Sequence, residues 1–182
     1  MIYYWLHLIY LYIGARFFWS KVDITSNQVN HRRVSLFDCD ALKYMANSRY
    51  FYYMDFIRFE KLFRSKLYEN SFKKGMYPVF GAQKIIYKKP LKRWTAFTVT
   101  LMLEGWDEKW YYHKHIFSNK NGICAIGYTK AAFWKNHKLQ DLAPIFKNCG
   151  MTETEKKIPS EIVHLFENDQ QLLKHKIKNN SK

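Results

Sequence analysis

The sequence predicts an α+β protein in which an antiparallel sheet curls around one long helix. A helical run carries apolar side chains on a broad face, and strand-like runs both precede and follow it. An Asn-Gly turn, typical of antiparallel hairpins, separates the last two of these runs. The 182 residues suffice for one domain with extensions and a sizeable core.

The first predicted elements are a strand and the long helix. Residues 30–37 place the apolar Val34 and Leu36 among polar neighbours, which favours a strand. A loop over residues 38–46 leads into a helical run from Ser48 to Leu67, whose apolar side chains recur at spacings of three and four. Because this apolar face is so broad, we expect a sheet to wrap around the helix.

Four strand-like runs complete the predicted sheet. They cover residues 81–88, 97–103, 110–117 and 123–134, and each gap between them contains Gly or Pro. Asn121-Gly122 predicts a hairpin between the last two runs. The predicted domain therefore covers residues 28–136, without an internal repeat.

The first twenty residues form a separate, very apolar segment whose one formal charge is Arg16. A helix over roughly nineteen residues would rise about 28 Å, close to the hydrocarbon thickness of a bilayer. We therefore predict a membrane anchor helix over residues 1–20, with an amphipathic or core-docking helix as the alternative. The basic residues that follow favour a cytoplasmic position for the rest of the chain.

Residues 137–182 form a polar C-terminal extension that ends in a Lys- and Asn-rich run. Within it, Pro159-Ser160-Glu161 begins a helical pattern that continues to Leu173. We expect this helix to pack on the domain or on its surroundings.

Basic residues dominate the charge, with 30 Lys and Arg against 15 Asp and Glu and a net charge of +15. Such a field attracts nucleic acid, an anionic membrane surface or a phosphorylated molecule such as coenzyme A, although AT-rich coding DNA also produces this Lys-rich composition. No RRM, KH or zinc motif accompanies the charge, so we expect no nucleic-acid partner. Three widely separated cysteines indicate a reducing compartment. His113 and His115 share a strand face without a third ligand, so we predict no metal or cofactor.

The loop before the long helix reads Asp38-Cys39-Asp40-Ala41-Leu42-Lys43-Tyr44-Met45-Ala46-Asn47-Ser48-Arg49-Tyr50. It resembles the signature D-x-D-x-x-x-H-x-N-N-x-x-Y of hotdog acyl-CoA and acyl-carrier-protein thioesterases. Two further segments resemble the same family: Ile86 to Leu91, and Leu103 to Asp107 with the Gly122 hairpin. The chain is thus similar to the hotdog-fold acyl-CoA thioesterase superfamily, and within it to the thioesterase superfamily member six-like proteins.

This resemblance implies a hotdog fold and the hydrolysis of a fatty-acyl thioester, with acyl-CoA as substrate, at a membrane surface. It also implies a homodimer with the site between subunits, and we expect the endoplasmic reticulum as the location, with the domain facing the cytoplasm. Tyr44 and Ala46 depart from the signature, in place of His and Asn. The alternative is therefore a catalytically weakened hotdog protein that binds acyl groups or acts structurally at the membrane.

The resemblance also assigns roles to individual residues. Asp40 matches the family's nucleophile or general base, and Asn47 and Tyr44 are the other catalytic candidates. The substrate-binding candidates lie in the loop and first helical turn, or form a basic group suited to the phosphates of coenzyme A: Asp38, Met45, Ala46, Tyr50, Lys88, Lys89, Lys92 and Arg93. The basic group could instead be a solvated loop or contact lipid headgroups.

The spacing suits this chemistry. A carboxylate shortly before a helix can lie beside a substrate carbonyl while the first free N–H groups of the helix point at its oxygen. Asn47 is predicted as the N-cap. The two aspartates could equally be turn residues, and Cys39 beside them is either a nucleophile or a small core residue. The long helix carries more aromatic side chains than one small sheet can cover, and we call this excess its aromatic surplus. A homodimer would bury the surplus, unless a terminal helix of the same chain covers it.

Overall fold

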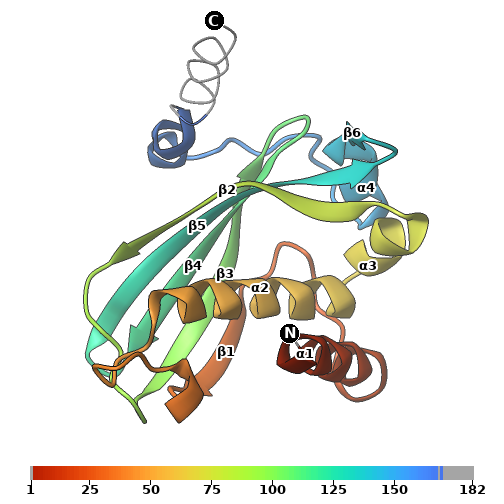
Figure 1. Ribbon diagram of the computed structural model, residues 1–182. Helices are drawn as coiled ribbons and strands as arrows, with labels where there is room; N and C mark the ends of the chain where they lie inside the picture. Colours follow the sequence, from red (N-terminus) through yellow and green to blue (C-terminus); the bar gives the residue numbers. More distant parts are fainter. Residues whose placement is uncertain (1, 168, 170–182) are drawn as a thin grey trace, which may run out of the picture.

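An antiparallel sheet wraps around helix α2 (Asn47–Arg64) in the computed structural model of the protein, which describes residues 2–167 and 169 (Figure 1). The strand order is β1-β3-β4-β5-β2, and every neighbouring pair is antiparallel. This arrangement confirms the predicted α+β fold class. The strands are β1 (Gln28–Arg33), β2 (Tyr77–Tyr87), β3 (Ala96–Trp106), β4 (Tyr111–Asn119), β5 (Gly122–Lys135) and the short β6 (Lys138–Leu139), which pairs with β5.

Helix α2 buries its apolar face in the concave side of the sheet. Tyr50, Met54 and Ile57 are almost fully buried there. Gly127 on β5 allows this close approach, because a Cβ atom at that position would lie 2.6 Å from the Met54 sulfur. Small residues facing a helix are a usual means of bringing backbone and side chain into contact.

The long helix is shorter than the predicted run from 48 to 67. It ends at Arg64 because Ser65 takes an extended conformation, with ψ 166°, and its hydroxyl accepts a hydrogen bond from the Leu67 N–H at 3.3 Å. A second short helix, α3 (Leu67–Asn70), and the 3-10 turn η3 (Phe72–Lys74) then lead to β2. Serine competes with the helix for backbone hydrogen bonds, which explains the break.

The first strand ends earlier than predicted, whereas the hairpin is confirmed. β1 stops at Arg33, and residues of the predicted strand end form the 3-10 turn η2 (Leu36–Asp38). Between β4 and β5, Gly122 has φ +99°, and the Asn119 side chain accepts a hydrogen bond from the Asn121 N–H at 2.8 Å. Glycine adopts this backbone conformation without strain.

The N-terminal segment folds as helix α1 (Ile2–Ile13) followed by the π-helical turn η1 (Gly14–Phe18), and α1 lies beside α2 (Figure 1). Its inner face packs on α2: His7 stacks on Phe56 with ring centroids 4.1 Å apart, and Leu11 is fully buried. The His7 Nδ1 and the Tyr52 hydroxyl share a hydrogen bond of 2.9 Å. Helix α1 therefore covers the aromatic surplus of α2 within the chain. This is the alternative in which a terminal helix, and not a second subunit, buries these side chains.

The outer face of the N-terminal segment is exposed and apolar, and Trp5 and Phe18 belong to it. Within residues 2–167 and 169, no helix combines the length and the apolar character that a membrane span needs.

The C-terminal extension contributes to the core more than its polar composition suggested. Helix α4 (Leu142–Asn148) was not predicted, yet Leu142 and Phe146 are buried against Trp106 of β3. A further helix begins at residue 160, as predicted, and Ile162 and Phe166 pack against the outer face of the sheet. The predicted end of this helix, over residues 170–173, lies outside the described residues.

Candidate active site

An open cleft of about 330 Å³ lies at the N-terminal end of α2. The structure brings together seven of the predicted site residues in its lining, whereas the side chains of Asp38, Ala46, Lys92 and Arg93 lie outside it. Two lining residues were not among the predicted site residues: Tyr87 and Pro90. The complete lining is Asp40, Tyr44, Met45, Asn47, Tyr50, Tyr87, Lys88, Lys89 and Pro90.

The loop that carries Asp40 is a tight turn closed by backbone hydrogen bonds. The Asp40 N–H donates to the Tyr44 carbonyl oxygen at 2.8 Å, and Lys43 has φ +67°. Asp40 Oδ1 accepts from the N–H groups of Leu42 at 2.9 Å and Tyr44 at 3.2 Å. Its second oxygen, Oδ2, accepts no hydrogen bond from the described part of the chain. The carboxylate is therefore exposed, oriented and available to a ligand.

The loop is fastened to the end of the second segment that resembles the thioesterase family. The Met45 N–H donates to the Leu91 carbonyl oxygen at 2.8 Å, and the Arg93 N–H donates to the Lys43 carbonyl oxygen at 2.9 Å. Tyr44 also forms an isolated bridge with Lys92. The two segments therefore form neighbouring walls of one cleft, although some forty residues separate them in the chain.

The start of α2 leaves N–H groups free at the cleft. Ala46, not Asn47, is the N-cap, and its methyl group provides no capping hydrogen bond. The N–H groups of Asn47 and Ser48 have no acceptor among the described residues. Free N–H groups in the first helical turn carry partial positive charge and attract an oxygen anion. Asn47 lies in the first turn and lines the cleft, so its predicted capping role is corrected.

Asp38 is a buried structural centre rather than part of the cleft lining. Its Oδ2 accepts hydrogen bonds from the Ser35 N–H, the Ser35 hydroxyl and the Tyr53 hydroxyl at 2.7–2.9 Å. Its Oδ1 accepts from two nitrogens of Arg49, each at 2.7 Å. Burial alone would raise the pKa of Asp38, but the hydrogen bonds from Ser35, Tyr53 and Arg49 outweigh it and hold the pKa below its usual value. The carboxylate thus joins the loop to the second turn of α2.

The basic side of the cleft consists of Lys88 and Lys89 at the end of β2. Both backbone N–H groups donate to the Cys124 carbonyl oxygen, at 2.8 and 2.9 Å, so the two residues are held in place although their side chains are exposed. The Lys89 ammonium donates to the Asn121 carbonyl oxygen at 3.2 Å. Exposed, flexible ammonium groups suit the phosphates of a large ligand.

Aromatic rings form the floor of the cleft. Tyr50 is buried, with its ring centroid 5.1 Å from that of Tyr87 and 5.0 Å from that of Phe117. Burial raises the pKa of Tyr50 to about 12, so its phenol is neutral near pH 7. Tyr87 belongs to the segment Ile86 to Leu91, and that resemblance was the signal that could have placed it in the site.

Cys39 and the two histidines lie away from the cleft lining. The Cys39 thiol donates to the Ser35 carbonyl oxygen at 3.3 Å, and burial raises its pKa, which disfavours the thiolate that a nucleophile needs. His115 is fully buried, and its Nε2 accepts a hydrogen bond from Arg58 at 3.3 Å. These contacts favour a structural role for Cys39 and His115.

A sheet curled around a long helix is the hotdog fold, and the aspartate before the helix matches the thioesterase signature described above. The chain belongs to the thioesterase-like superfamily, whose family model matches residues 13–163. It is 35% identical to Protein THEM6 of Xenopus laevis over 80 residues, which are 44% of this chain and 39% of that protein. It is 29% identical to a probable thioesterase of Saccharomyces cerevisiae over 124 residues, which are 64% of this chain and 52% of that protein.

These matches thus span about half, or less, of the two curated relatives. Among solved structures, the fold is similar to that of the probable thioesterase YbaW from Escherichia coli, with a TM-score of 0.61 and 16% identity. The similarity covers 66% of this chain and 97% of that one.

Proposed function

We propose that the protein hydrolyses acyl-CoA thioesters in the cleft at the start of α2. The observation that carries the proposal is that one cleft is lined by the Asp40 carboxylate, by Asn47 in the first turn of α2, and by Lys88 and Lys89. The family membership supports the same reaction class.

The geometry suggests how each group acts. The substrate carbonyl oxygen lies toward the first turn of α2, whose N–H groups stabilise the negative charge that develops there. Asp40 either attacks the carbonyl carbon or removes a proton from an attacking water molecule. The C–S bond then breaks, the thiol leaves with a proton, and water supplies the remaining oxygen and hydrogen of the carboxylic acid. Lys88 and Lys89 bind the coenzyme A phosphates.

The test is a thiol-release assay of the full-length protein on acyl-CoAs of increasing chain length. We expect Asp40→Asn to lower kcat by about 10²- to 10⁴-fold, because the amide keeps the turn but provides neither base nor nucleophile. Asp23→Asn is the matched control, since Asp23 makes a similar turn with Thr25, away from the cleft. Full activity of Asp40→Asn would refute the catalytic assignment.

A second candidate function is acyl binding without efficient turnover. Tyr44 supports it, because a phenol replaces the imidazole of the family signature and does not exchange protons readily near neutral pH. A wild-type protein that binds acyl-CoA but releases no thiol from any chain length would establish this alternative.

We further propose that the protein acts at a membrane surface, at the cytoplasmic face of the endoplasmic reticulum. Support comes from the N-terminal segment, where ten large apolar residues are exposed, far more than single scattered residues on an ordinary surface. Anionic lipid would also attract the net charge of +15. The ten residues are Ile2, Tyr3, Trp5, Leu6, Ile9, Tyr10, Tyr12, Ile13, Phe17 and Phe18.

Vesicle sedimentation tests the membrane proposal with a matched pair of variants. Phe18 and Phe37 are 80% and 89% exposed, and only Phe18 lies in the N-terminal segment. We expect Phe18→Ser to reduce binding to vesicles that contain anionic lipid, and Phe37→Ser to leave it unchanged. Equal binding by both variants, or no binding by wild type, would contradict the proposal. Fractionation of cells expressing the full chain tests the organelle.

A homodimer is proposed as well, with β2 as the contact strand. Among the described residues, β2 pairs only with β5, so one edge of this long strand is open. β2 also leads directly into Lys88 and Lys89, and a second subunit on this edge would therefore lie beside the cleft.

A further inference from the structure

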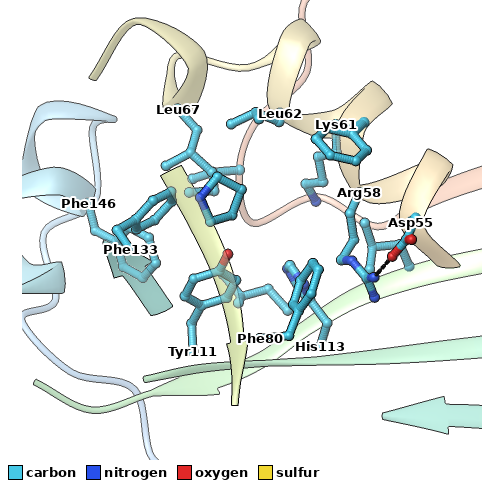
Figure 2. A pocket seen from close by; sticks show the side chains of 15 residues that line it. Asp55, Arg58, Lys61, Leu62, Leu67, Phe80, Tyr111, His113, Phe133 and Phe146 are labelled. Carbon is cyan, nitrogen blue, oxygen red and sulfur yellow. Dashed lines mark hydrogen bonds and ion pairs between the residues drawn. The ribbon is translucent and has the colours of Figure 1, made fainter. Parts of the chain in front are cut away.

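A second cavity, of about 40 Å³ and partly open to solvent, lies between the C-terminal half of α2 and the sheet (Figure 2). It shares no lining residue with the cleft at the start of the helix. Its walls come from α2, from strands β2 to β5 and from α4. The proposed hydrolytic reaction does not use this cavity.

A buried guanidinium forms one end of the cavity. Arg58 extends from α2 toward His113 on β4 (Figure 2). One terminal nitrogen of Arg58 donates to the Thr129 hydroxyl at 2.7 Å and to His115 Nε2 at 3.3 Å, and the other donates to Asp55. These bonds fix the guanidinium in place without any contribution from a ligand.

Two polar atoms of residues that line this end remain without a partner among the described residues. Arg58 Nε and His113 Nδ1 are buried and form no hydrogen bond with the described residues. Both residues line the cavity. A buried polar atom without a partner costs about 1–3 kcal/mol, so partners within the cavity would be stabilising. The hydroxyl of Tyr111 also points into the cavity (Figure 2).

The charged lining residues carry more positive than negative charge. They are the cations Arg58 and Lys61 and the carboxylate Asp55, which is already paired with Arg58. Lys61 donates to the Ser26 carbonyl oxygen, and the nearby Asp23 is exposed and therefore screened by solvent. A buried excess of positive charge is unfavourable, and an anion of one charge would balance it.

The opposite end of the cavity is apolar. Phe133 and Phe146 line it, and Leu67 closes it from the side of α3 (Figure 2). A ligand that satisfies both ends has a charged group and a short hydrocarbon part. One water molecule needs about 10–15 Å³ of such a cavity, so the volume of about 40 Å³ has room for roughly three water molecules. That volume excludes a fatty-acyl chain and suits only a small carboxylate.

We propose that this cavity binds a short-chain monocarboxylate, with its carboxylate at Arg58 Nε and His113 Nδ1 and its hydrocarbon end against Phe133 and Phe146. The carboxylate accepts from the free Arg58 N–H and, in the appropriate tautomer, from His113. This site is independent of the Asp40 cleft.

Calorimetric titration of the full-length protein with sodium butyrate, at constant ionic strength, tests the proposal. We expect saturable binding of one butyrate per chain and no binding of 1-butanol, which has a similar chain but no charge. Butyrate labelled with ¹³C in its methyl group should show nuclear Overhauser contacts to the rings of Phe133 and Tyr111. This measurement needs no variant.

Variants then separate the cavity from the cleft. His113→Phe removes one hydrogen bond to the anion and should weaken butyrate binding about tenfold or more. Leu103→Phe places a larger side chain in the cavity and should abolish binding, whereas Lys89→Ala in the cleft should leave it unchanged. Asp40→Asn should lose hydrolysis yet bind butyrate as wild type does. Absence of binding to wild type, contacts to Tyr50 and Tyr87 instead, or equal binding of butyrate and butanol would each overturn the proposal.

Discussion

Asp38 and Asp40 are separated by one residue, yet the surroundings of their carboxylates differ completely. Asp38 is 1% exposed and accepts five hydrogen bonds, whereas Asp40 is exposed and uses one oxygen to hold its own turn. The first carboxylate therefore stabilises the loop and the second is free to react. The aspartate pair was visible in the sequence, but this division was not, because Ser35 and Tyr53 meet Asp38 only in the folded chain.

Asp38→Asn should destabilise the protein. The amide cannot accept all the hydrogen bonds of the carboxylate and leaves Arg49 without its anion, so we expect a loss of about 2–4 kcal/mol at pH 7. Asp40→Asn, at an exposed position, should change the free energy of unfolding by less than about 0.5 kcal/mol. Urea denaturation of the full-length variants measures both values.

The loss caused by Asp38→Asn should also depend on pH. The pKa of Asp38 is lower in the folded protein than in the unfolded chain, so its stabilisation is complete above the unfolded value of about 4. That stabilisation disappears as the pH falls through the lower folded pKa. The difference between wild type and Asp38→Asn should therefore narrow in acid. A difference that is the same at pH 7 and pH 3 would show that the ionised carboxylate is not the cause.

At the scale of elements, periodic apolar patterns located most of the strands and the long helix. The predicted elements differ from the observed ones where side-chain hydrogen bonds or distant contacts determine the backbone conformation. Ser65 ends α2 although the apolar spacing continues to Leu67. Helix α4 is only seven residues long, and its burial depends on Trp106 and Phe133 from remote strands. No local pattern in a polar extension could reveal such contacts.

The C-terminal extension is held to the sheet through Gly105, which provides an element-scale prediction. A Cβ atom at Gly105 would lie 2.9 Å from the Lys156 carbonyl oxygen and 3.0 Å from the Ile158 Cα, both backbone atoms. Trp106 and Lys156 exchange two backbone hydrogen bonds of 3.1 Å at this point. We therefore expect Gly105→Ala to displace residues 156–158 and to destabilise the protein by about 1–3 kcal/mol.

Hydrogen exchange measures this displacement directly. The amides of Trp106 and Lys156 should exchange faster in Gly105→Ala than in wild type, and the core of α2 should not change. Gly75→Ala is a control in which the added methyl group meets no neighbour, because no atom lies within 4 Å of the Cβ position. Its only cost comes from the positive φ of +73° at this residue. Unchanged exchange at Trp106 and Lys156 would show that the extension tolerates the added methyl group.

At the scale of the whole molecule, the two sheet edges differ in a way that favours only one of them for pairing. β1 has two arginines and a histidine in six residues, and charged edge strands resist association. β2 has one charge, Lys84, in eleven residues, and Ile86 is 56% exposed. The sequence suggested a dimer from the aromatic surplus of α2, but α1 covers that surplus. The open β2 edge supports the proposed dimer instead.

The dimer should form through β2 and depend on its apolar character. Sedimentation equilibrium of the full-length protein, in a nonionic detergent matched in density to the buffer, should give twice the chain mass of 22.1 kDa. Ile86→Lys places an extra charge on each β2 edge and should shift the protein to monomer, because charged side chains on an edge strand resist pairing with another chain. Val29→Lys on β1, where Val29 is 49% exposed, is the matched control and should remain dimeric. A wild-type mass of one chain, or equal dissociation by both variants, would exclude β2 as the contact strand and with it a cleft shared between subunits.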